Sequence, residues 1–192
     1  MTDEPSALSK TFIWARDRKM KVSPADRQTF ATGINDNGTI TGNVRKSFSG
    51  SEAIIADKRG VRGVGVLAPP LSTTSFGINN SAVIGMIYSS AFSTELAEWS
   101  GSNQIVLSGV GADAFGIDDS GTILGINEAS LIWNPAFGSA WVVDLITPNS
   151  PPVSGLILDS IAANGLMTGQ AYYQNVPSAV ILTPVSGATK GR

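Results

Sequence analysis

The chain has 192 residues, 42% of them hydrophobic and 15% charged, which is enough apolar sequence for one packed domain and too little charge for a disordered chain. It contains no cysteine and no histidine, which excludes disulfides, the common zinc sites and any Ser-His-Asp or Cys-His mechanism. A net charge of −2, with no aromatic stripe among the basic residues, argues against nucleic acid as a partner.

In chain order, residues 1–10 are interpreted as a tail, residues 11–185 as a single β-repeat domain and residues 186–192 as a second tail. The first residues are polar and acidic, so no signal peptide is expected at this start. No run approaches the length of a membrane span, so no membrane partner is expected.

A hairpin signature recurs four times along the domain. Gly-Ile-Asn-Asp-Asn-Gly-Thr-Ile-Thr-Gly at residues 33–42 returns at 77–85, at 116–125 and, more weakly, at 160–169. The aligned isoleucines lie 44, 39 and 44 residues apart. This period predicts repeated four-stranded units.

Each copy of the signature predicts a strand, a tight turn and a second strand. Asn, Asp and Gly tolerate the positive φ of such turns, and Asx side chains accept hydrogen bonds from the backbone two residues on. The acidic copies at residues 36–38 and 118–121 lack the alternating ligands and distal Glu of an EF-hand, so the turn interpretation is preferred to a calcium loop, and no metal site is expected.

The remaining strands of each unit follow the hairpins. Apolar third strands are predicted at 52–56, 95–99, 130–133 and 178–182, and fourth strands at 61–67, 104–110 and 140–146. Residues 11–14 match a third strand and residues 19–22 a fourth, giving seventeen strands in all. Trp14, Trp99 and Trp133 share the third-strand position and are interpreted as core between units.

These motifs resemble the bacterial HAF repeat family. The resemblance is carried by the Gly-Ile-Asn-Asp-Asn-Gly-x-Ile-x-Gly element and by small-apolar-Trp strands such as residues 130–133, over nearly the whole of 11–185. The His-Ala-Phe triplet that names the family is absent, because the chain has no histidine. The resemblance implies extracellular or periplasmic repeats of uncertain role, with a cytoplasmic location left open, and it supplies no catalytic residues.

Four-stranded units at this period are typical of a β-propeller, here with about four to five blades, and an open β-solenoid or sandwich is the alternative. Propellers close radially, often with one blade built from both termini. The strand at 19–22 is therefore a candidate to complete the last blade, residues 160–182.

Charge is unevenly distributed along the chain. Eleven of the thirteen basic residues fall within 1–62, and residues 63–189 contain eight carboxylates and no Lys or Arg. The asymmetry favours either steering of an anionic ligand or association of copies through opposite-charge sectors. A solvated surface without further role is the third interpretation.

A binding site is expected where the loops before the first strands meet those after the second strands. Aromatic faces beside polar groups there suit a glycan or small organic ligand. The alternative for each aromatic residue is packing beneath its own loop. The candidate ligand-binding residues are Arg27, Phe48, Tyr88, Phe92, Tyr172 and Tyr173.

Three functions therefore stay open. The first is a binding or scaffolding module for a glycan or small organic ligand. The second is a cofactor-free lyase, isomerase or cyclase with Asp113 or Glu128 as its acid–base residue. The third is a structural, self-associating surface protein. No cofactor is expected for any of them.

Overall fold

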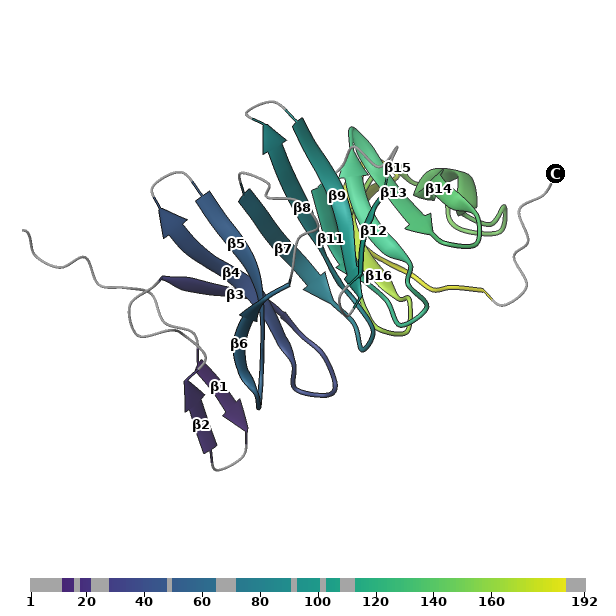
Figure 1. Ribbon diagram of the computed structural model, residues 1–192. Helices are drawn as coiled ribbons and strands as arrows, with labels where there is room; N and C mark the ends of the chain where they lie inside the picture. The colour runs from purple at the N-terminus through teal and green to yellow at the C-terminus, as the bar shows by residue number, and fades with distance from the viewer. Residues whose placement is uncertain are drawn as a thin grey trace, which may run out of the picture.

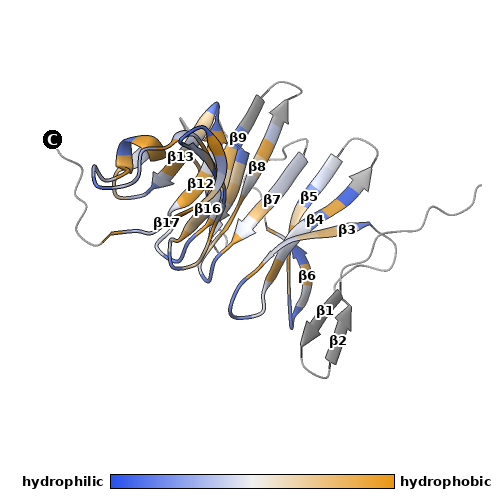
Figure 2. Cartoon of the chain, turned by 180° about the vertical axis from the view of Figure 1, so that it is seen from behind, coloured by the Kyte–Doolittle hydropathy of each residue, from blue (hydrophilic) through white to orange (hydrophobic). Residues whose placement is uncertain are grey.

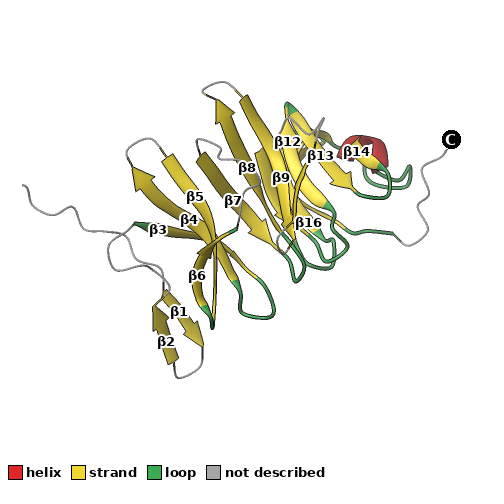
Figure 3. Cartoon of the chain, in the orientation of Figure 1, coloured by secondary structure: helices red, strands yellow, loops and turns green. Residues whose placement is uncertain are grey.

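The computed structural model describes the backbone of residues 12–15, 18–21, 28–47, 50–64, 72–90, 93–100, 103–107 and 113–185. Within these ranges the regular structure is seventeen strands, the predicted number, and one 3-10 turn, η1 (Val142–Leu145). The all-β prediction is confirmed (Figure 3).

The strands form antiparallel sheets in chain order. Sheet 1 contains β3 (Thr29–Ile34), β4 (Ile40–Ser47), β5 (Gly50–Asp57) and β6 (Gly60–Gly63). Sheet 2 contains β7 (Ser72–Ile78), β8 (Val83–Ser90), β9 (Ser93–Ser100) and β10 (Asn103–Val106). Sheet 3 contains β11 (Asp113–Ile117), β12 (Ile123–Asn127), β13 (Ala129–Asn134) and β14 (Gly138–Trp141).

Sheet 4 has three strands among the described residues, β15 (Ser154–Ile161), β16 (Met167–Tyr173) and β17 (Val176–Leu182). A separate hairpin pairs β1 (Phe12–Ala15) with β2 (Arg18–Lys21). Sheets 1 to 4 stack face to face in chain order (Figure 1). The first strands of sheets 2, 3 and 4 each lie against the sheet before them. Consecutive units of the repeat are thus consecutive layers of one stack.

Two sequence expectations are wrong. The strand at 19–22 was expected to complete the last unit, but β2 pairs with β1, and among the described residues sheet 4 consists of β15, β16 and β17, the last of which forms its edge (Figure 2). The fourth strand expected at 140–146 ends at Trp141, because the chain turns into η1 there and buries Val142 between sheets 3 and 4. Residues 65–67 and 108–110 of two other expected strands lie outside the described residues.

A register shift recurs in the first strand of every sheet. It falls between Ala31 and Gly33 in sheet 1 and at the equivalent place in the others. In sheet 2 the first strand crosses so close to the second that a Cβ on Gly85 would overlap the carbonyl oxygen of Thr74. A Cβ on Gly42 or Gly169 would likewise overlap the carbonyl oxygen of Phe30 or Ile157, so close approach explains the glycine that ends these three signatures.

Apolar clusters fill the spaces between neighbouring sheets. Trp99, 2% exposed, belongs to the cluster between sheets 1 and 2, and Trp133 packs against the cluster between sheets 2 and 3. The prediction that these two tryptophans are core is confirmed, whereas the side chain of Trp14 lies outside the described residues. Leu124 and Leu158 are fully buried between sheets 3 and 4.

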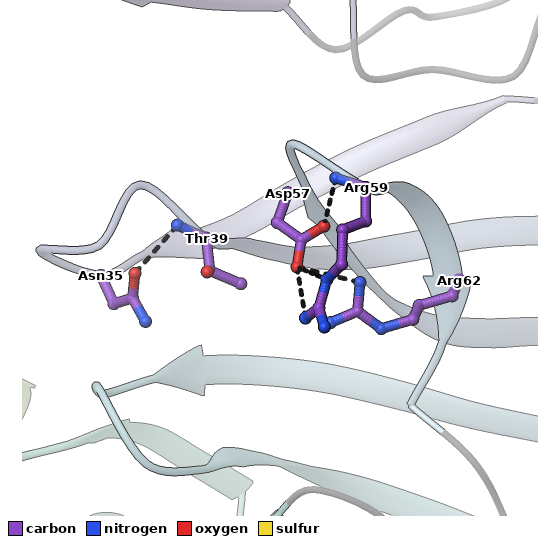
Figure 4. Close-up of polar contacts among 5 residues, drawn as sticks. All are labelled: Asn35, Thr39, Asp57, Arg59 and Arg62. Carbon is purple, nitrogen blue, oxygen red and sulfur yellow. Dashed lines mark hydrogen bonds and ion pairs between the residues drawn. The ribbon is translucent and has the colours of Figure 1, made fainter.

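The signature turns are built as predicted and also connect the sheets. Asn35 Oδ1 accepts a hydrogen bond from Thr39 N at 2.9 Å (Figure 4), and Asp118 Oδ1 accepts one from Thr122 N at 2.8 Å. The Asn35 amide donates across to the Asn79 carbonyl at 3.0 Å, and the Asn79 amide donates to the Asp118 carbonyl at 2.7 Å. In the first two turns one side chain, Asn35 or Asn79, therefore closes its own hairpin and bonds the next sheet, whereas the third turn reaches sheet 4 through the backbone bond from Asp119 N to the Ala163 carbonyl.

Candidate functional site

The stack has two ends with different connections. At the turn end lie the turns between first and second strands and those between third and fourth strands. At the loop end the first strands begin and the second strands connect to the third strands, at Glu128 in sheet 3 and at Gln174 and Asn175 in sheet 4. The loop end corresponds to the mouth expected from the sequence.

Asp113 and Glu128 lie at the loop end of sheet 3. Asp113, the first residue of β11, pairs with Ile126, and Ile126 pairs with Ser130. Residues paired across strands project from the same face. Ser130 Oγ accepts a hydrogen bond from Leu158 N at 2.7 Å, which shows that this face is turned toward sheet 4. Asp113 therefore projects toward sheet 4.

Glu128 forms the connection from β12 to β13 and has a φ of 62°. This left-handed conformation is uncommon for residues other than Gly, Asn and Asp. Glu128 is exposed, as is Asp113. The connection thus presents a second carboxylate beside the strand that pairs with Asp113.

Tyr173 approaches the same space from sheet 4. It lies on the same face of β16 as Met167, because side chains alternate along a strand. Met167 and its partner Leu182 both pack in the cluster between sheets 3 and 4. Tyr173 projects beyond that cluster at the loop end, and its ring is 42% exposed. The end of the space between sheets 3 and 4 therefore carries Asp113, Glu128 and Tyr173, which we call the loop-end site.

The other candidates lie elsewhere. Tyr88 is on the face of sheet 2 that carries Ile84, so it points toward sheet 3, where it is half-buried. Tyr172 lies on the opposite face of β16 from Tyr173, with Gly155 beneath its ring, and is 48% exposed. Arg27, Phe48 and Phe92 lie outside the described residues. Strand register therefore places Asp113, Glu128 and Tyr173 at the loop end of sheets 3 and 4, and it places Tyr88 and Tyr172 on other faces.

The loop-end site offers hydrogen-bond acceptors beside an aromatic ring. Carboxylates accept from hydroxyl groups, and the face of a tyrosine packs on apolar surface while its hydroxyl stays solvated. Within the described residues there is no cluster of three or more acidic side chains suited to a metal ion. The described residues also contain no helix that would cross a membrane.

The turn end carries a basic cluster that was not singled out from the sequence. Asp57 Oδ2 accepts hydrogen bonds from Arg59 Nη2 at 2.9 Å and Arg62 Nη1 at 3.0 Å (Figure 4). The Arg59 guanidinium, together with Arg62, holds the pKa of Asp57 well below its usual range. A shallow depression of about 160 Å³ lies over residues 59–62. In the sequence the corresponding signal is an aspartate, Asp57, followed across a short turn by two arginines, Arg59 and Arg62.

The side chain of Glu98 should make the thermal stability of the protein depend on pH. It is half-buried on the sheet 3 side of β9, and burial raises its pKa. The folded state therefore holds this proton more tightly than the unfolded chain, so the Glu98 contribution to stability is greatest at acidic pH and is lost as pH rises through the folded pKa. We expect Glu98→Gln to melt above the wild type at pH 7, with a difference that shrinks as pH falls toward 4.5, the ordinary pKa of a glutamate, in thermal scans from pH 7 to about 4.

The matched control is Glu95→Gln, because Glu95 is exposed on the same strand. Its melting temperature should follow that of the wild type at every pH. A Glu98→Gln variant that melts below the wild type at neutral pH would show that the carboxylate makes a stabilising contact.

No protein-family model and no curated protein matches the chain. Among solved structures the chain is similar to TolB from Acinetobacter baumannii, with a TM-score of 0.52 and 11% sequence identity. TolB is a β-propeller protein. The alignment covers 88% of this chain and 47% of TolB, so the chain spans about half the length of that structure. At this identity the similarity concerns the fold alone, and it supports a propeller-like arrangement of repeated antiparallel sheets.

Proposed function

We propose that the protein is a propeller-like binding module that recognises a glycan or small organic ligand at the loop-end site. The proposal is supported by the position of Asp113 and Glu128 at the loop end of sheet 3 and of Tyr173 at the loop end of sheet 4, with Asp113 and Tyr173 on the facing surfaces of the two sheets. A sugar presents hydroxyl groups to carboxylates and an apolar ring face to an aromatic side chain, which matches this set.

Binding is preferred to catalysis because both carboxylates are exposed. Acid–base catalysis gains from a site that excludes water. Asp113 and Glu128 lie instead in solvent, where they suit recognition of hydroxyl groups. Assignment to the HAF repeat family forms part of the same proposal and rests on the hairpin signature alone.

The proposal predicts that removal of the Tyr173 side chain weakens ligand binding. Native mass spectrometry against a library of neutral and acidic oligosaccharides should give a bound species for the wild type. For the ligand so selected, Tyr173→Ala should weaken binding at least tenfold in calorimetric titration, about 1.4 kcal/mol. Asp113→Asn should also weaken binding, since the amide replaces one acceptor oxygen by a donor.

Phe137→Ala is the matched control. Phe137 is 46% exposed in the connection from β13 to β14, at the turn end of the same sheet. Its removal should leave the dissociation constant unchanged. Equal losses in the Tyr173 and Phe137 variants, or no bound species in the wild type, would count against the loop-end site.

A further inference from the structure

We infer that the turn between β5 and β6 forms a second binding site, one that takes the phosphate or sulfate group of an anionic ligand. The site consists of Arg59 and Arg62, which Asp57 holds next to each other (Figure 4). It lies at the turn end of sheet 1, whereas the loop-end site lies at the opposite end of the strands, in sheets 3 and 4. The two sites are therefore separate.

This turn differs in charge from its counterparts in the repeat. Residues 57–60 read Asp-Lys-Arg-Gly, whereas the corresponding turns of sheets 2 and 3 read Ser-Gly-Ser-Asn at 100–103 and Asn-Pro-Ala-Phe-Gly at 134–138. Sheets 2 to 4 lie within residues 72–182, which contain no Lys or Arg. Since uncharged residues connect the same strands elsewhere, the charges of this turn point to a role beyond connection.

The surface of this turn is positively charged. Residues 57–62 contain one acidic and three basic residues, and the whole β5–β6 hairpin contains two acidic and three basic residues. The Asp57 side chain is only 13% exposed, whereas that of Arg59 is 72% exposed and that of Arg62 is 43% exposed. The turn therefore presents its two guanidinium groups to solvent, with the carboxylate beneath them.

Asp57 fixes the position of both guanidinium groups. Its Oδ1 accepts a hydrogen bond from Arg59 N at 2.8 Å. Its Oδ2 accepts from Arg59 Nη2 at 2.9 Å, from Arg59 Nε at 3.2 Å and from Arg62 Nη1 at 3.0 Å. A guanidinium has five N–H groups, so each arginine has N–H groups that these bonds do not use. Because the two groups are already held in place, less side-chain entropy is lost when a ligand binds them.

Two adjacent guanidinium groups suit a tetrahedral oxyanion. The two oxygens of a carboxylate match the fork of one arginine. A phosphate or sulfate group has further oxygens that point in other directions, so it can accept from both forks. The depression of about 160 Å³ over residues 59–62 includes Gly60, where an added Cβ would have no atom within 4 Å. The backbone of the turn therefore leaves room for such a group beside the arginines.

Titration with inorganic phosphate tests the site, with the amide chemical shifts of ¹⁵N-labelled protein recorded at constant ionic strength. The largest shifts should fall within residues 57–62 and should saturate as for a single site. Sodium chloride at the same ionic strength should not reproduce them. Phosphate shifts that are centred on Asp113 and residues 126–129, or that do not saturate, would overturn the inference.

Arg62→Lys separates recognition by a guanidinium from attraction to charge. Lysine keeps the charge but replaces the planar fork by an ammonium, so we expect phosphate binding to weaken by about fivefold or more. Arg59→Lys should have the same effect, and thermal scans check that both variants fold. The matched control is Lys58→Gln, at an exposed residue of the same turn, which should weaken binding less than Arg62→Lys does. A larger loss in the Lys58 variant would reduce the site to general attraction of anions and refute its assignment to the arginines.

Two further probes identify the source of the bound group. A sulfated disaccharide presents it on a soluble glycan, and vesicles of phosphatidylcholine and phosphatidic acid present it on a lipid surface. If phosphate binds, tighter binding of the disaccharide assigns the site to a sulfated glycan, cosedimentation with vesicles that Arg62→Lys abolishes assigns it to a lipid headgroup, and neither result assigns it to the free anion. Tyr173→Ala should leave phosphate binding unchanged, so the loop-end site and this site fail in different variants.

Discussion

Gly85→Ala is expected to destabilise the protein by about 3 kcal/mol, at the upper end of the cost of overpacking a core. The added Cβ would overlap the carbonyl oxygen of Thr74 and approach Ser75 Cα, and both are backbone atoms of the strand that pairs with β8. Backbone in the middle of a stack cannot move aside as a side chain can. In a chain of this size the change corresponds to a fall in melting temperature of roughly 6–12 °C, measured by calorimetry.

Gly63→Ala is the matched control in the neighbouring sheet. The Cβ there would meet the carboxylate end of the Glu52 side chain and not backbone. We expect a change of less than about 1 kcal/mol. If the two alanine variants melted at the same temperature, the signature glycine would not be required for the close approach of the first and second strands.

Asn79→Ala is expected to cost about 2–3 kcal/mol, because it removes three hydrogen bonds at a buried position. The side chain is 7% exposed, and its Oδ1 accepts from Ser81 N and Ala82 N, both at 2.7 Å. Its amide donates to the Asp118 carbonyl in the next sheet. Denaturant unfolding should show a lower midpoint, together with faster amide exchange in the turns of sheets 2 and 3.

Asn80→Ala provides the comparison within the same turn. Asn80 is exposed, and its bonds to Asp36 and Asn37 join side chains in solvent. Its removal should change stability by less than about 0.5 kcal/mol. A cost for Asn80 equal to that for Asn79 would show that the turns are held together through their exposed contacts.

The sequence predicts the sheets well because each repeat contains the residues that determine its own turns and strands. The spacing of the isoleucines gives the number of repeated units. The Asn-, Asp- and Gly-rich segments give the positions of the hairpin turns within them. The signature does not reveal that Asn35 and Asn79 also reach the next sheet. These bonds between sheets depend on how the units stack, and the residues of a turn do not by themselves determine the stacking.

The candidate site is less predictable because adjacent residues of a strand face opposite ways. Tyr172 and Tyr173 are neighbours in sequence and were assigned to one site, yet they lie on opposite faces of β16. Which of them faces sheet 3 follows from the position of Met167 and its partner Leu182 in the cluster between sheets 3 and 4.

Chemical-shift mapping tests the central claim most directly, because it locates a ligand without relying on any variant. A ligand found by the library screen should be titrated into ¹⁵N-labelled protein. The loop-end site predicts that the largest amide shifts fall at Asp113, at 126–129 and at 171–173. Shifts centred instead on the turn-end residues 57–62, around the Asp57–Arg62 cluster, would contradict it.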